Sequence, residues 1–186
     1  FLDMPLVLER FFATEALNEV GIGLSKALPL PWHSSWSAQI VNGDNPLWVS
    51  KTDEDFLLVA RLKSEWDIDA ERALVWGLSW AGGRNVKERF TSVYGVDVRL
   101  QLNARLLWQS EYLLANENLK THKTQRGGFY SFVKYQTTRR SWAQVRYDLY
   151  GLPEDRDEGE NRISILLGFA PRKLLPLRFQ YSRWRI

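Results

Sequence analysis

Small, charged or amide residues occupy every second position from Gly95 to Asn103 within residues 93–103, whose sequence is VYGVDVRLQLN. Asp97, Arg99 and Gln101 fall on one set of positions, and the residues between them, beginning with Tyr94, are apolar. Because successive side chains of a β-strand point to opposite faces, this spacing predicts a strand with one polar and one apolar face. Ionised groups on such a face either line a water-filled path for ions and solutes or pair across strands to stiffen the wall.

The length of this segment indicates the environment of the strand. Strands of soluble sheets average about 5 or 6 residues, whereas a strand tilted across a lipid bilayer needs roughly 9 to 11. Tyr94, at the end of the apolar row, suits the headgroup region, where aromatic rings with one polar edge gather. Residues 93–103 therefore predict a strand that crosses a membrane.

The same two-residue period continues over most of the chain after residue 19. We expect residues 1–19 to be a loop with at most one short helical turn, because their apolar residues do not alternate. The pattern predicts an all-β single domain over residues 1–186, folded as a transmembrane up-and-down antiparallel β-barrel. The predicted strands are residues 20–28, 35–41, 56–67, 73–80, 93–103, 106–114, 129–138, 142–149, 163–170 and 177–184.

The connections between these predicted strands alternate between short and long. Outer-membrane barrels sort their connections in this way, with the short turns in the periplasm. A soluble up-and-down barrel such as a lipocalin is the alternative, but it fills its interior with apolar residues around a ligand. The short connections are residues 28–34, 68–72, 103–105, 139–141 and 171–176, and the longer ones are residues 42–55, 82–89, 115–128 and 151–161.

On this orientation both ends of the chain lie outside the cell. Bacterial barrels have even strand numbers, and we take their termini to be periplasmic. We therefore expect at least one strand before Phe1 and one after Ile186, in a barrel of twelve or more strands. The first and last predicted strands would pair with these strands or with another subunit. The loops expected outside contain Asn118, Lys123, Asp155 and Gly159, and the turns expected in the periplasm contain Pro31, Ala70, Ala104, Arg140 and Arg172.

Composition is compatible with this fold but does not decide it. The chain is 45% hydrophobic and 25% charged, which also suits a soluble domain. No run approaches the roughly 18 apolar residues of a membrane helix, and the nine Trp, seven Tyr and nine Phe suit the aromatic girdles of a barrel. A net charge of +3 is too small to indicate nucleic-acid binding. The absence of cysteine excludes disulfides and thiolate metal sites.

The polar face of the predicted strands supplies the candidate site residues. Its cations and anions nearly balance, which argues against a pore dedicated to phosphate, since such a pore needs a basic ladder. Arg10, Phe11 and Phe12 precede the first strand, where an extracellular loop either folds into the lumen and narrows it or packs its two rings on the rim. The candidate pore-lining residues are Arg61, Lys63, Glu65, Asp67, Asp97, Arg99, Gln101, Glu111, Lys134, Arg146, Asp148 and Arg178.

The sequence predicts no enzyme, no cofactor and no metal site. His33 and His122 have no neighbouring carboxylate or cysteine with which to bind zinc. Ser34 and Ser35 beside His33 suggest a nucleophile and its base, but neighbours in sequence rarely have triad geometry and no acid is near them. The acidic residues 154–160 carry enough oxygens for a divalent cation, although a solvated loop is the simpler explanation.

Five segments carry a resemblance to a known family: residues 17–32, 59–68, 94–101, 106–115 and 141–153. On these segments the chain resembles the Gram-negative outer-membrane proteins described as zinc-regulated TonB-dependent receptors, which are porin-like barrels distantly related to the phosphate-selective porins. The resemblance implies an outer-membrane location and a role in solute conduction or uptake, with no catalytic residues and no zinc ligands to transfer. The chain departs from the family in having no plug domain and no terminal aromatic residue.

We therefore expect a porin-like channel in the outer membrane of a Gram-negative bacterium, which passes small solutes or ions through a charged, water-filled lumen. Its surroundings would be the lipid bilayer and lipopolysaccharide, and nucleic acid is not expected as a partner. The alternative is a non-conducting outer-membrane barrel that anchors a surface assembly and binds protein partners through its long loops or edges. The sequence contains no catalytic triad that would support an outer-membrane hydrolase.

Overall fold

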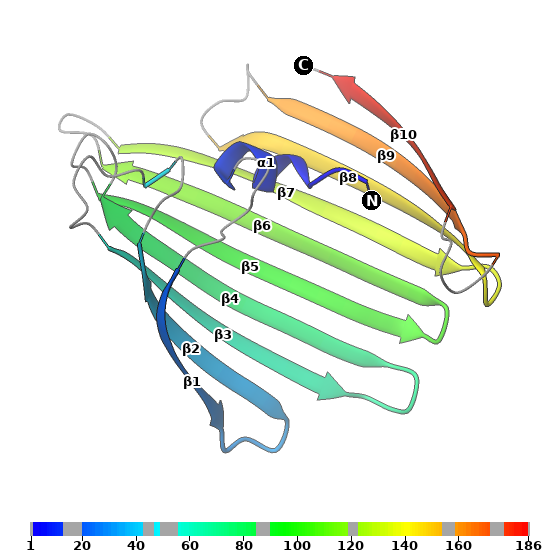
Figure 1. The fold of residues 1–186 in the computed structure, drawn as a ribbon, viewed down its shortest axis with the longest axis horizontal. Helices are drawn as coiled ribbons and strands as arrows, with labels where there is room; N and C mark the ends of the chain where they lie inside the picture. The colour runs from blue at the N-terminus through cyan, green and yellow to red at the C-terminus, as the bar shows by residue number, and fades with distance from the viewer. Residues whose placement is uncertain are drawn as a thin grey trace.

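A ten-stranded antiparallel sheet makes up most of the structure (Figure 1). Each strand is hydrogen-bonded to the next one along the chain, in the order β1-β2-β3-β4-β5-β6-β7-β8-β9-β10. The computed structural model describes residues 2–12, 20–42, 47–48, 56–84, 90–118, 123–153, 159–171 and 177–185. The all-β class, the ten predicted strands and their up-and-down order are confirmed. The elements are α1 (Leu6–Phe12), β1 (Gly21–Leu28), β2 (His33–Val41), β3 (Leu57–Asp67), β4 (Ala73–Arg84), β5 (Phe90–Asn103), β6 (Leu106–Asn118), β7 (Lys123–Gln136), β8 (Ser141–Pro153), β9 (Glu160–Phe169) and β10 (Leu177–Arg185).

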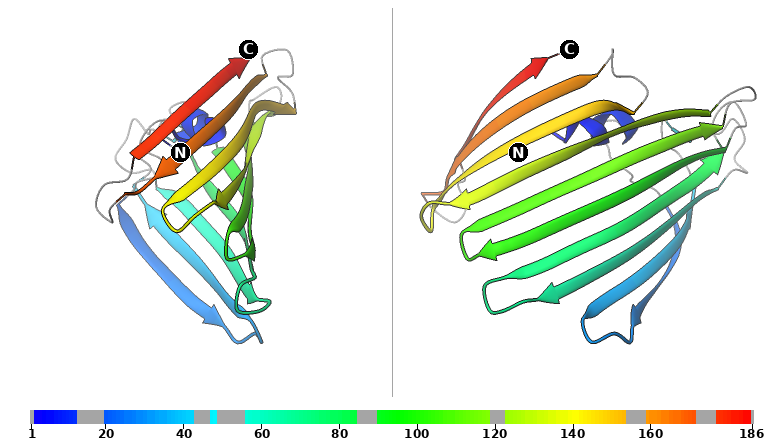
Figure 2. Two further views of the ribbon diagram at one scale, coloured as in Figure 1. Left: turned by 90° about the vertical axis from the view of Figure 1, so that its right-hand side faces the viewer. Right: turned by 180° about the vertical axis from the view of Figure 1, so that it is seen from behind.

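The sheet is curved and open. Among the described residues, β1 pairs with β2 alone and β10 with β9 alone, so these ten strands do not confirm the prediction of a closed barrel. The expectation that the first and last strands pair with further strands or with another subunit stays a prediction. Figure 2 shows the sheet bent into a trough with α1 on its concave side. We call the concave side the inner face and the opposite side the outer face.

Several strands are longer than predicted, at the end where the long loops were expected. β4 continues to Arg84 and β6 to Asn118, and β7 begins at Lys123. The two-residue period fails in these extensions because inner-face positions such as Ala81 and Ala115 are apolar and buried. Such positions do not contrast with the apolar outer face, so alternation no longer marks a strand there.

The connections at this end are correspondingly shorter than predicted. The strand bounds leave residues 85–89 between β4 and β5 and residues 119–122 between β6 and β7. These connections are no longer than residues 68–72 and about as short as residues 137–140 at the opposite end. The connection between β2 and β3, residues 42–56, stays long. The predicted sorting of connections by length is therefore largely wrong, so connection lengths do not support a barrel.

The outer face is predominantly apolar, although the exposed side chains of Lys26, Arg183 and Arg185 also lie on it. Directly opposed residues of neighbouring strands share a face, so the register traces each face from strand to strand. The side chains of Phe179 and Tyr181 on β10 are 69% and 67% exposed. The residues predicted to face lipid along β5, from Tyr94 to Leu102, lie on this face. One of its rows consists of Trp66, Leu74, Leu100, Trp108, Val133, Val145, Ile165 and Tyr181.

The hydrophobic core lies on the inner face, beneath α1. The helix starts after Pro5, a residue whose fixed φ suits a first turn, and the Pro5 carbonyl accepts a hydrogen bond from the N–H of Glu9 (3.0 Å). Val7, Phe11 and Phe12 turn toward the sheet, so residues 6–12 of the segment predicted as a loop with a short helical turn form a docked amphipathic helix. Their partners in the core are Val41, Trp48, Leu57, Ala81, Val93, Leu113, Ala115 and Tyr130.

Candidate functional site

The strand register places all the candidate pore-lining residues on the inner face. Arg61 lies opposite Ser79, and Arg178 lies opposite Gly168. The alternation in the sequence therefore selected a single face of the folded sheet. The other candidates belong to three rows: Lys63, Gly77, Asp97, Glu111, Tyr130, Asp148 and Arg162; Glu65, Val75, Arg99, Gln109, Phe132, Arg146 and Ser164; and Asp67, Ala73, Gln101, Leu107, Lys134 and Gln144.

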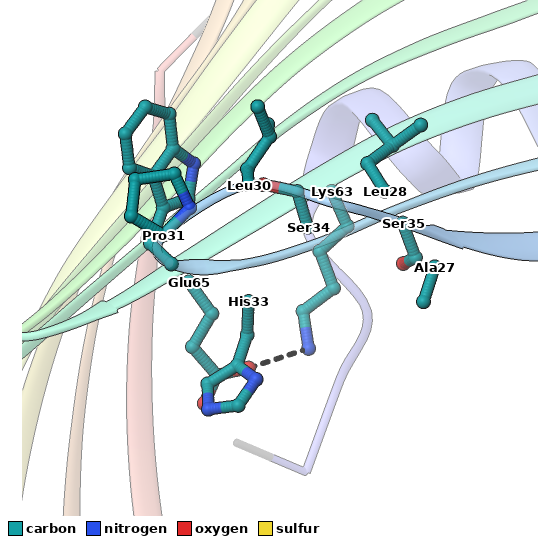
Figure 3. Close-up of a pocket in the computed structure, with 10 residues that line it drawn as sticks. Ala27, Leu28, Leu30, Pro31, His33, Ser34, Ser35, Lys63 and Glu65 are labelled. Atoms are coloured by element: carbon teal, nitrogen blue, oxygen red, sulfur yellow. Dashed lines mark hydrogen bonds and ion pairs between the residues drawn. The ribbon is translucent and has the colours of Figure 1, made fainter.

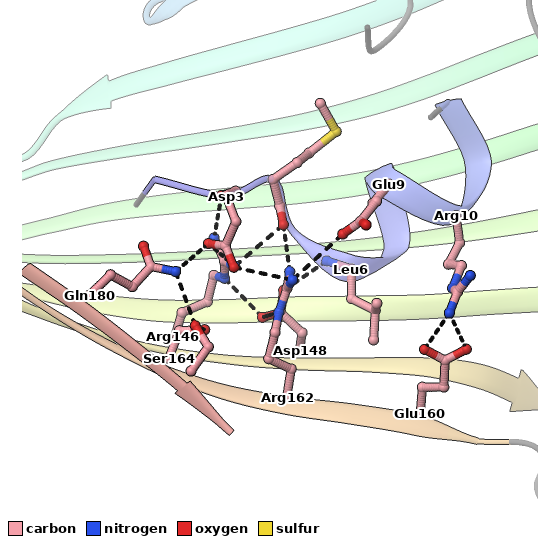
Figure 4. A network of polar contacts seen from close by, with 12 residues as sticks. Asp3, Leu6, Glu9, Arg10, Arg146, Asp148, Glu160, Arg162, Ser164 and Gln180 are labelled. Atoms are coloured by element: carbon pink, nitrogen blue, oxygen red, sulfur yellow. Dashed lines mark hydrogen bonds and ion pairs between the residues drawn. The ribbon is translucent and has the colours of Figure 1, made fainter. Parts of the chain in front are cut away.

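A buried ionic network lies on the inner face of β8 and β9, beneath residues 2–12 (Figure 4). We call residues 2–12 the N-terminal segment. Asp148 is fully buried, and its carboxylate accepts hydrogen bonds from Arg146 Nε (2.9 Å) and Arg162 Nε (3.2 Å). The backbone N–H of Leu6 donates a third hydrogen bond (3.0 Å) to the same carboxylate. One carboxylate between two guanidinium groups leaves one positive charge to be balanced.

Asp3 of the N-terminal segment supplies that balance. Its carboxylate lies 2.9 Å from Arg146 Nη2 and 3.2 Å from Arg162 Nη1. Gln180 Nε2 donates a further hydrogen bond to it (2.6 Å). Burial alone raises the pKa of the Asp3 carboxyl group, but the Gln180 hydrogen bond and the two guanidinium charges outweigh burial and lower that pKa below its ordinary value. The ionised form of Asp3 therefore holds the segment to β8, β9 and β10.

Phe11 and Phe12 attach the C-terminal end of α1 by aromatic contacts. Phe11 packs edge-on against Tyr150 of β8, with 5.9 Å between the ring centroids. Phe12 stacks on Trp48, with a centroid distance of 6.2 Å and an interplanar angle of 26°. The indole N–H of Trp48 donates to the carbonyl of Thr91 (3.0 Å), which fixes Trp48 on the sheet. Both Phe rings are therefore buried against the inner face and do not lie on an outer surface.

Arg10, near the C-terminal end of the N-terminal segment, forms an ion pair with β9. Its Nη2 atom lies 2.5 and 2.6 Å from the two carboxylate oxygens of Glu160, at the start of β9. This hydrogen bond raises the pKa of the Arg10 guanidinium group above its ordinary value. Residues 10–12 therefore lie against the inner face of the sheet, and their role in narrowing a lumen stays a prediction.

A second ionic cluster lies on β3, β5, β6 and β7, and its member Tyr130 also belongs to the core beneath α1. Arg61 Nη2 donates to Asp97 Oδ1 (2.7 Å) from two strands away. The contact passes over Gly77, where an added Cβ atom would lie 2.6 Å from Asp97 Oδ1. Glu111 lies directly opposite Asp97 and accepts a hydrogen bond from the Tyr130 hydroxyl (2.8 Å). Like charges in opposed positions repel, so Arg61 and Tyr130 stabilise this acidic pair.

The turn between β1 and β2 borders a hollow of about 330 Å³ (Figure 3). Lys63 Nζ lies 3.1 Å from Glu65 Oε2 within its lining. Glu65 is directly opposite His33 in the register, so the expectation that no acid lies near His33 is wrong. Ser34 points to the other face, where its hydroxyl bonds to a serine of β3 (2.7 Å). Because His33 and Ser34 occupy opposite faces, they do not form a nucleophile and base.

The remaining candidates on the inner face lie toward the short turns. Lys134 Nζ sits 5.8 Å from the ring centroid of Trp142, over its face. The amide of Gln101 donates to two backbone carbonyls of the β5–β6 turn, those of Asn103 and Leu106, so Gln101 supports the turn as well as the face. Of these remaining candidates, the exposed ones are Asp67, Arg99 and Arg178.

The sequence candidates omit several residues of the ionic network and of the helix contacts, four of which are Arg162, Asp3, Trp48 and Gln180. The sequence prediction starts the ninth strand at Ile163, one residue too late for Arg162, although the polar–apolar alternation of residues 162–165 includes it. Asp3 and Trp48 lie in segments without periodicity, so no signal in the sequence identifies them. The fourth residue is Gln180, which occupies a polar position of the tenth predicted strand.

Some expectations concern residues outside the described ranges, namely His122, Asp155 and Arg172. Within the described ranges, no three His, Cys, Asp or Glu side chains lie close enough together to hold a metal ion. No helix in the described part of the chain is both long and apolar enough to cross a membrane.

Comparison with known proteins finds similarity to an uncharacterized protein of Aquifex aeolicus (strain VF5), at 24% identity over 230 residues. The alignment covers 100% of this chain and 49% of that protein, so the chain spans about half the length of the curated relative that it matches. No protein-family model matches the chain, and no solved structure matches it. The resemblance to zinc-regulated TonB-dependent receptors and porins therefore stays a prediction.

Proposed function

We propose that this protein is an outer-membrane β-barrel channel that passes small solutes or ions passively through a charged, water-filled lumen. The observation that carries the proposal is the contrast between the two faces of one sheet. The outer face is predominantly apolar, with Lys26, Arg183 and Arg185 as charged exceptions on the two edge strands, whereas the inner face holds ionised side chains from β3 to β10. Lipid outside and water inside are the two solvents that suit these faces.

The exposed apolar surface and the strand lengths favour lipid as the solvent of the outer face. Soluble monomers rarely expose an apolar patch larger than a few hundred Å², yet the outer face exposes large side chains on nearly every strand, with Ile22 at 84% and Phe179 at 69%. The strands from β4 to β8 have 12 to 14 residues, which exceeds the roughly 9 to 11 that a tilted strand needs to cross a bilayer. A soluble ligand-binding barrel would instead turn apolar side chains inward.

The proposal includes closure of the barrel by further strands or by another subunit. In lipid, each unpaired N–H and C=O group along the edges of β1 and β10 would cost several kcal/mol. β1 and β10 run antiparallel to each other in the sheet, so an added even number of strands continues the alternation without a parallel pair.

The N-terminal segment is the proposed constriction of this channel. It covers the inner face of β7 and β8 with the apolar side of α1, and ionic contacts tie it to β8, β9 and β10. Cations and anions are mixed over the rest of the inner face, as in the pairs Arg61–Asp97 and Lys63–Glu65. A lumen narrowed in this way favours small solutes and discriminates weakly by charge.

Conductance in planar lipid bilayers tests the channel. The full-length protein should form conducting pores, and the double variant Phe11→Ala/Phe12→Ala should conduct more, because it loses the ring contacts that hold α1 to the sheet. Phe179→Ala is the matched control, since Phe179 lies exposed on the outer face, and it should leave the conductance unchanged. Membrane-inserted protein without conductance in any of these forms would contradict the channel.

A non-conducting barrel that anchors a surface assembly is the second candidate. The observation that favours it is the packing of Trp48 and α1 into one apolar cluster on the inner face, which would close the lumen rather than narrow it. Its partners would be proteins at the loops or at the sheet edges, together with the lipid bilayer and lipopolysaccharide. Loss of a surface complex in Gly159→Cys after bulky thiol labelling, with no conductance before labelling, would favour this candidate over the channel.

Membrane orientation provides a separate test. The chain contains no cysteine, so single cysteines report their side of the membrane without background. A membrane-impermeant maleimide applied to intact cells should label Gly159→Cys, before β9, and should not label Ala104→Cys, in the β5–β6 turn. Labelling of both positions or of Ala104→Cys alone would contradict the proposed orientation.

A further inference from the structure

Three polar side chains of the sheet converge on the carboxylate of Asp3 (Figure 4): Arg146 and Gln180 donate hydrogen bonds to it, and Arg162 forms an ion pair with it. Arg146 Nη2 lies 2.9 Å from Oδ1, Gln180 Nε2 lies 2.6 Å from Oδ1, and Arg162 Nη1 lies 3.2 Å from Oδ2. The donors belong to β8, β9 and β10, whereas Asp3 belongs to the N-terminal segment. The sheet therefore forms a complete cradle for a carboxylate group, and Asp3 is the group that occupies it.

The cradle has an excess positive charge without Asp3. Arg146 and Arg162 are each 1% exposed, and the buried Asp148 carboxylate balances only one of them. Glu9 lies 3.5 Å from Arg162, but its side chain is 42% exposed, so water screens this pair more strongly. A buried guanidinium group without a counterion is strongly unfavourable. The cradle therefore needs an anion at the position of the Asp3 carboxylate.

The occupant of the cradle is accessible from solution. The Asp3 side chain is 31% exposed, and the neighbouring Leu2 side chain is 62% exposed. Gln180 also accepts a hydrogen bond from the backbone N–H of Leu2 (2.7 Å), so it holds the start of the segment as well as the carboxylate. A small carboxylate in solution can reach the donors without any change in the strands.

We propose that Arg146, Arg162 and Gln180 form a binding site for carboxylate-bearing solutes, and that Asp3 is an internal ligand which such a solute displaces. Planar guanidinium groups bind the two oxygens of a carboxylate with a geometry that a spherical anion does not share. Displacement of Asp3 loosens the N-terminal segment from β8, β9 and β10. The link from binding to the width of the channel rests on the proposed function, whereas the binding itself does not.

Removal of the Asp3 carboxylate tests the site by chemical rescue. The melting temperature of Asp3→Ala should fall, and sodium acetate should restore about half or more of the loss, because a ligand that binds the folded state alone stabilises it. Sodium chloride at the same ionic strength should restore much less. Folded Asp3→Ala protein that responds equally to acetate and chloride would overturn the proposal.

Two variants and a second anion make this test specific. Asp69→Ala is the matched control, because Asp69 Oδ2 accepts a hydrogen bond from Arg72 Nε (2.6 Å) in the exposed β3–β4 turn, and acetate should not restore its stability beyond chloride. The double variant Asp3→Ala/Arg162→Met should lose the recovery by acetate. Sodium phosphate that stabilises Asp3→Ala more than acetate does would overturn the assignment to carboxylates.

A second experiment leaves Asp3 in place and measures displacement directly. A nitroxide label on Leu2→Cys, in a chain that otherwise lacks cysteine, reports the mobility of the segment by electron paramagnetic resonance. Acetate should increase the mobility of the label, and chloride should not. A label whose mobility stays constant at saturating acetate would contradict displacement, even where Asp3→Ala fails to fold.

Neither readout depends on conductance, so the two proposals fail separately. If the protein conducts ions but shows no response specific to acetate, the proposed carboxylate site is wrong and the proposed channel stands. A protein that binds acetate but does not conduct removes the channel and leaves the site.

Discussion

The inner face of the sheet carries two ionic clusters that look alike in the sequence and differ in the structure. Arg146 and Asp148 alternate along β8 as Asp97 and Arg99 alternate along β5. In the first cluster the side chains of Arg146 and Asp148 are 1% and 0% exposed, whereas in the second the side chains of Arg61 and Asp97 are 40% and 18% exposed. Alternation therefore identifies the face but says nothing about the environment of the charges on it.

The difference arises from the N-terminal segment, which covers β8 and β9 and excludes water from the first cluster. Burial strengthens the attraction between opposite charges, and it also raises the cost of leaving one of them without a partner. The pair Arg61–Asp97 keeps contact with solvent, so both effects are weaker there. The first cluster thus acts as an attachment site for the segment, whereas the Arg61–Asp97 pair of the second keeps part of its surface in contact with solvent.

The largest expected difference between the clusters follows from removing one carboxylate from each. Asp148→Ala leaves Arg146 and Arg162 buried with too little negative charge, and it should cost about 3 to 5 kcal/mol of unfolding free energy. Asp97→Ala should cost at most about 1 kcal/mol, because Arg61 stays hydrated. Urea unfolding in lipid vesicles measures both values. Equal losses would show that burial does not separate the two clusters.

A second pair of variants tests whether water lies on the inner face and lipid on the outer face. Leu100→Arg on the outer face of β5 should cost about 2 to 4 kcal/mol, the cost of an arginine near the middle of a bilayer. Gln101→Arg, one position along, should cost little and should change the ion preference of the channel. Vesicle unfolding measures the first effect and reversal potentials the second. Similar losses for both variants would contradict the assignment of the faces.

A smaller effect is expected at the crossing point of the second cluster. Gly77→Ala places a methyl group between Arg61 and Asp97, 2.6 to 2.7 Å from their terminal atoms in the present arrangement. The two side chains should move apart, with a loss of at most about 1 kcal/mol. Adding Arg61→Gln should then cause no further loss of unfolding free energy, because the ion pair is already broken. A large additional loss in the double variant would show that Arg61 stabilises the sheet in another way.

The smallest effect concerns the pH dependence of the attachment. The pKa of Asp3 is lower in the folded protein than its ordinary value of 3.8, so its ionised form is favoured when the segment is docked. This contribution to stability is complete above that ordinary value and is lost as the pH falls through the lowered pKa of the folded state. The mobility of a label on Leu2→Cys should therefore rise with acid below about pH 4. In Asp3→Asn this part of the change should disappear, and a persistent transition would assign it to another carboxyl group.

The sequence alone determined the fold class, the ten strands and the division of their residues between two faces. Local sterics are sufficient for this, because side chains alternate along any extended strand and one face of the sheet is predominantly apolar. All the candidate pore-lining residues consequently share the inner face. The strand ends were predicted poorly, since Ala81 and Ala115 face an apolar cluster that belongs to other segments of the chain.

Tertiary structure alone decided which charges are buried and what they bind. Asp3 meets Arg146, Arg162 and Gln180 across separations of more than 140 positions in the chain, and no periodicity links such distant residues. Trp48 likewise reaches the core from the connection between β2 and β3. These contacts form because a short amphipathic helix and a tryptophan bury apolar surface on the inner face. The energy of that burial, rather than any local pattern, makes the inner face of β8 and β9 an attachment site and leaves the Arg61–Asp97 pair partly exposed.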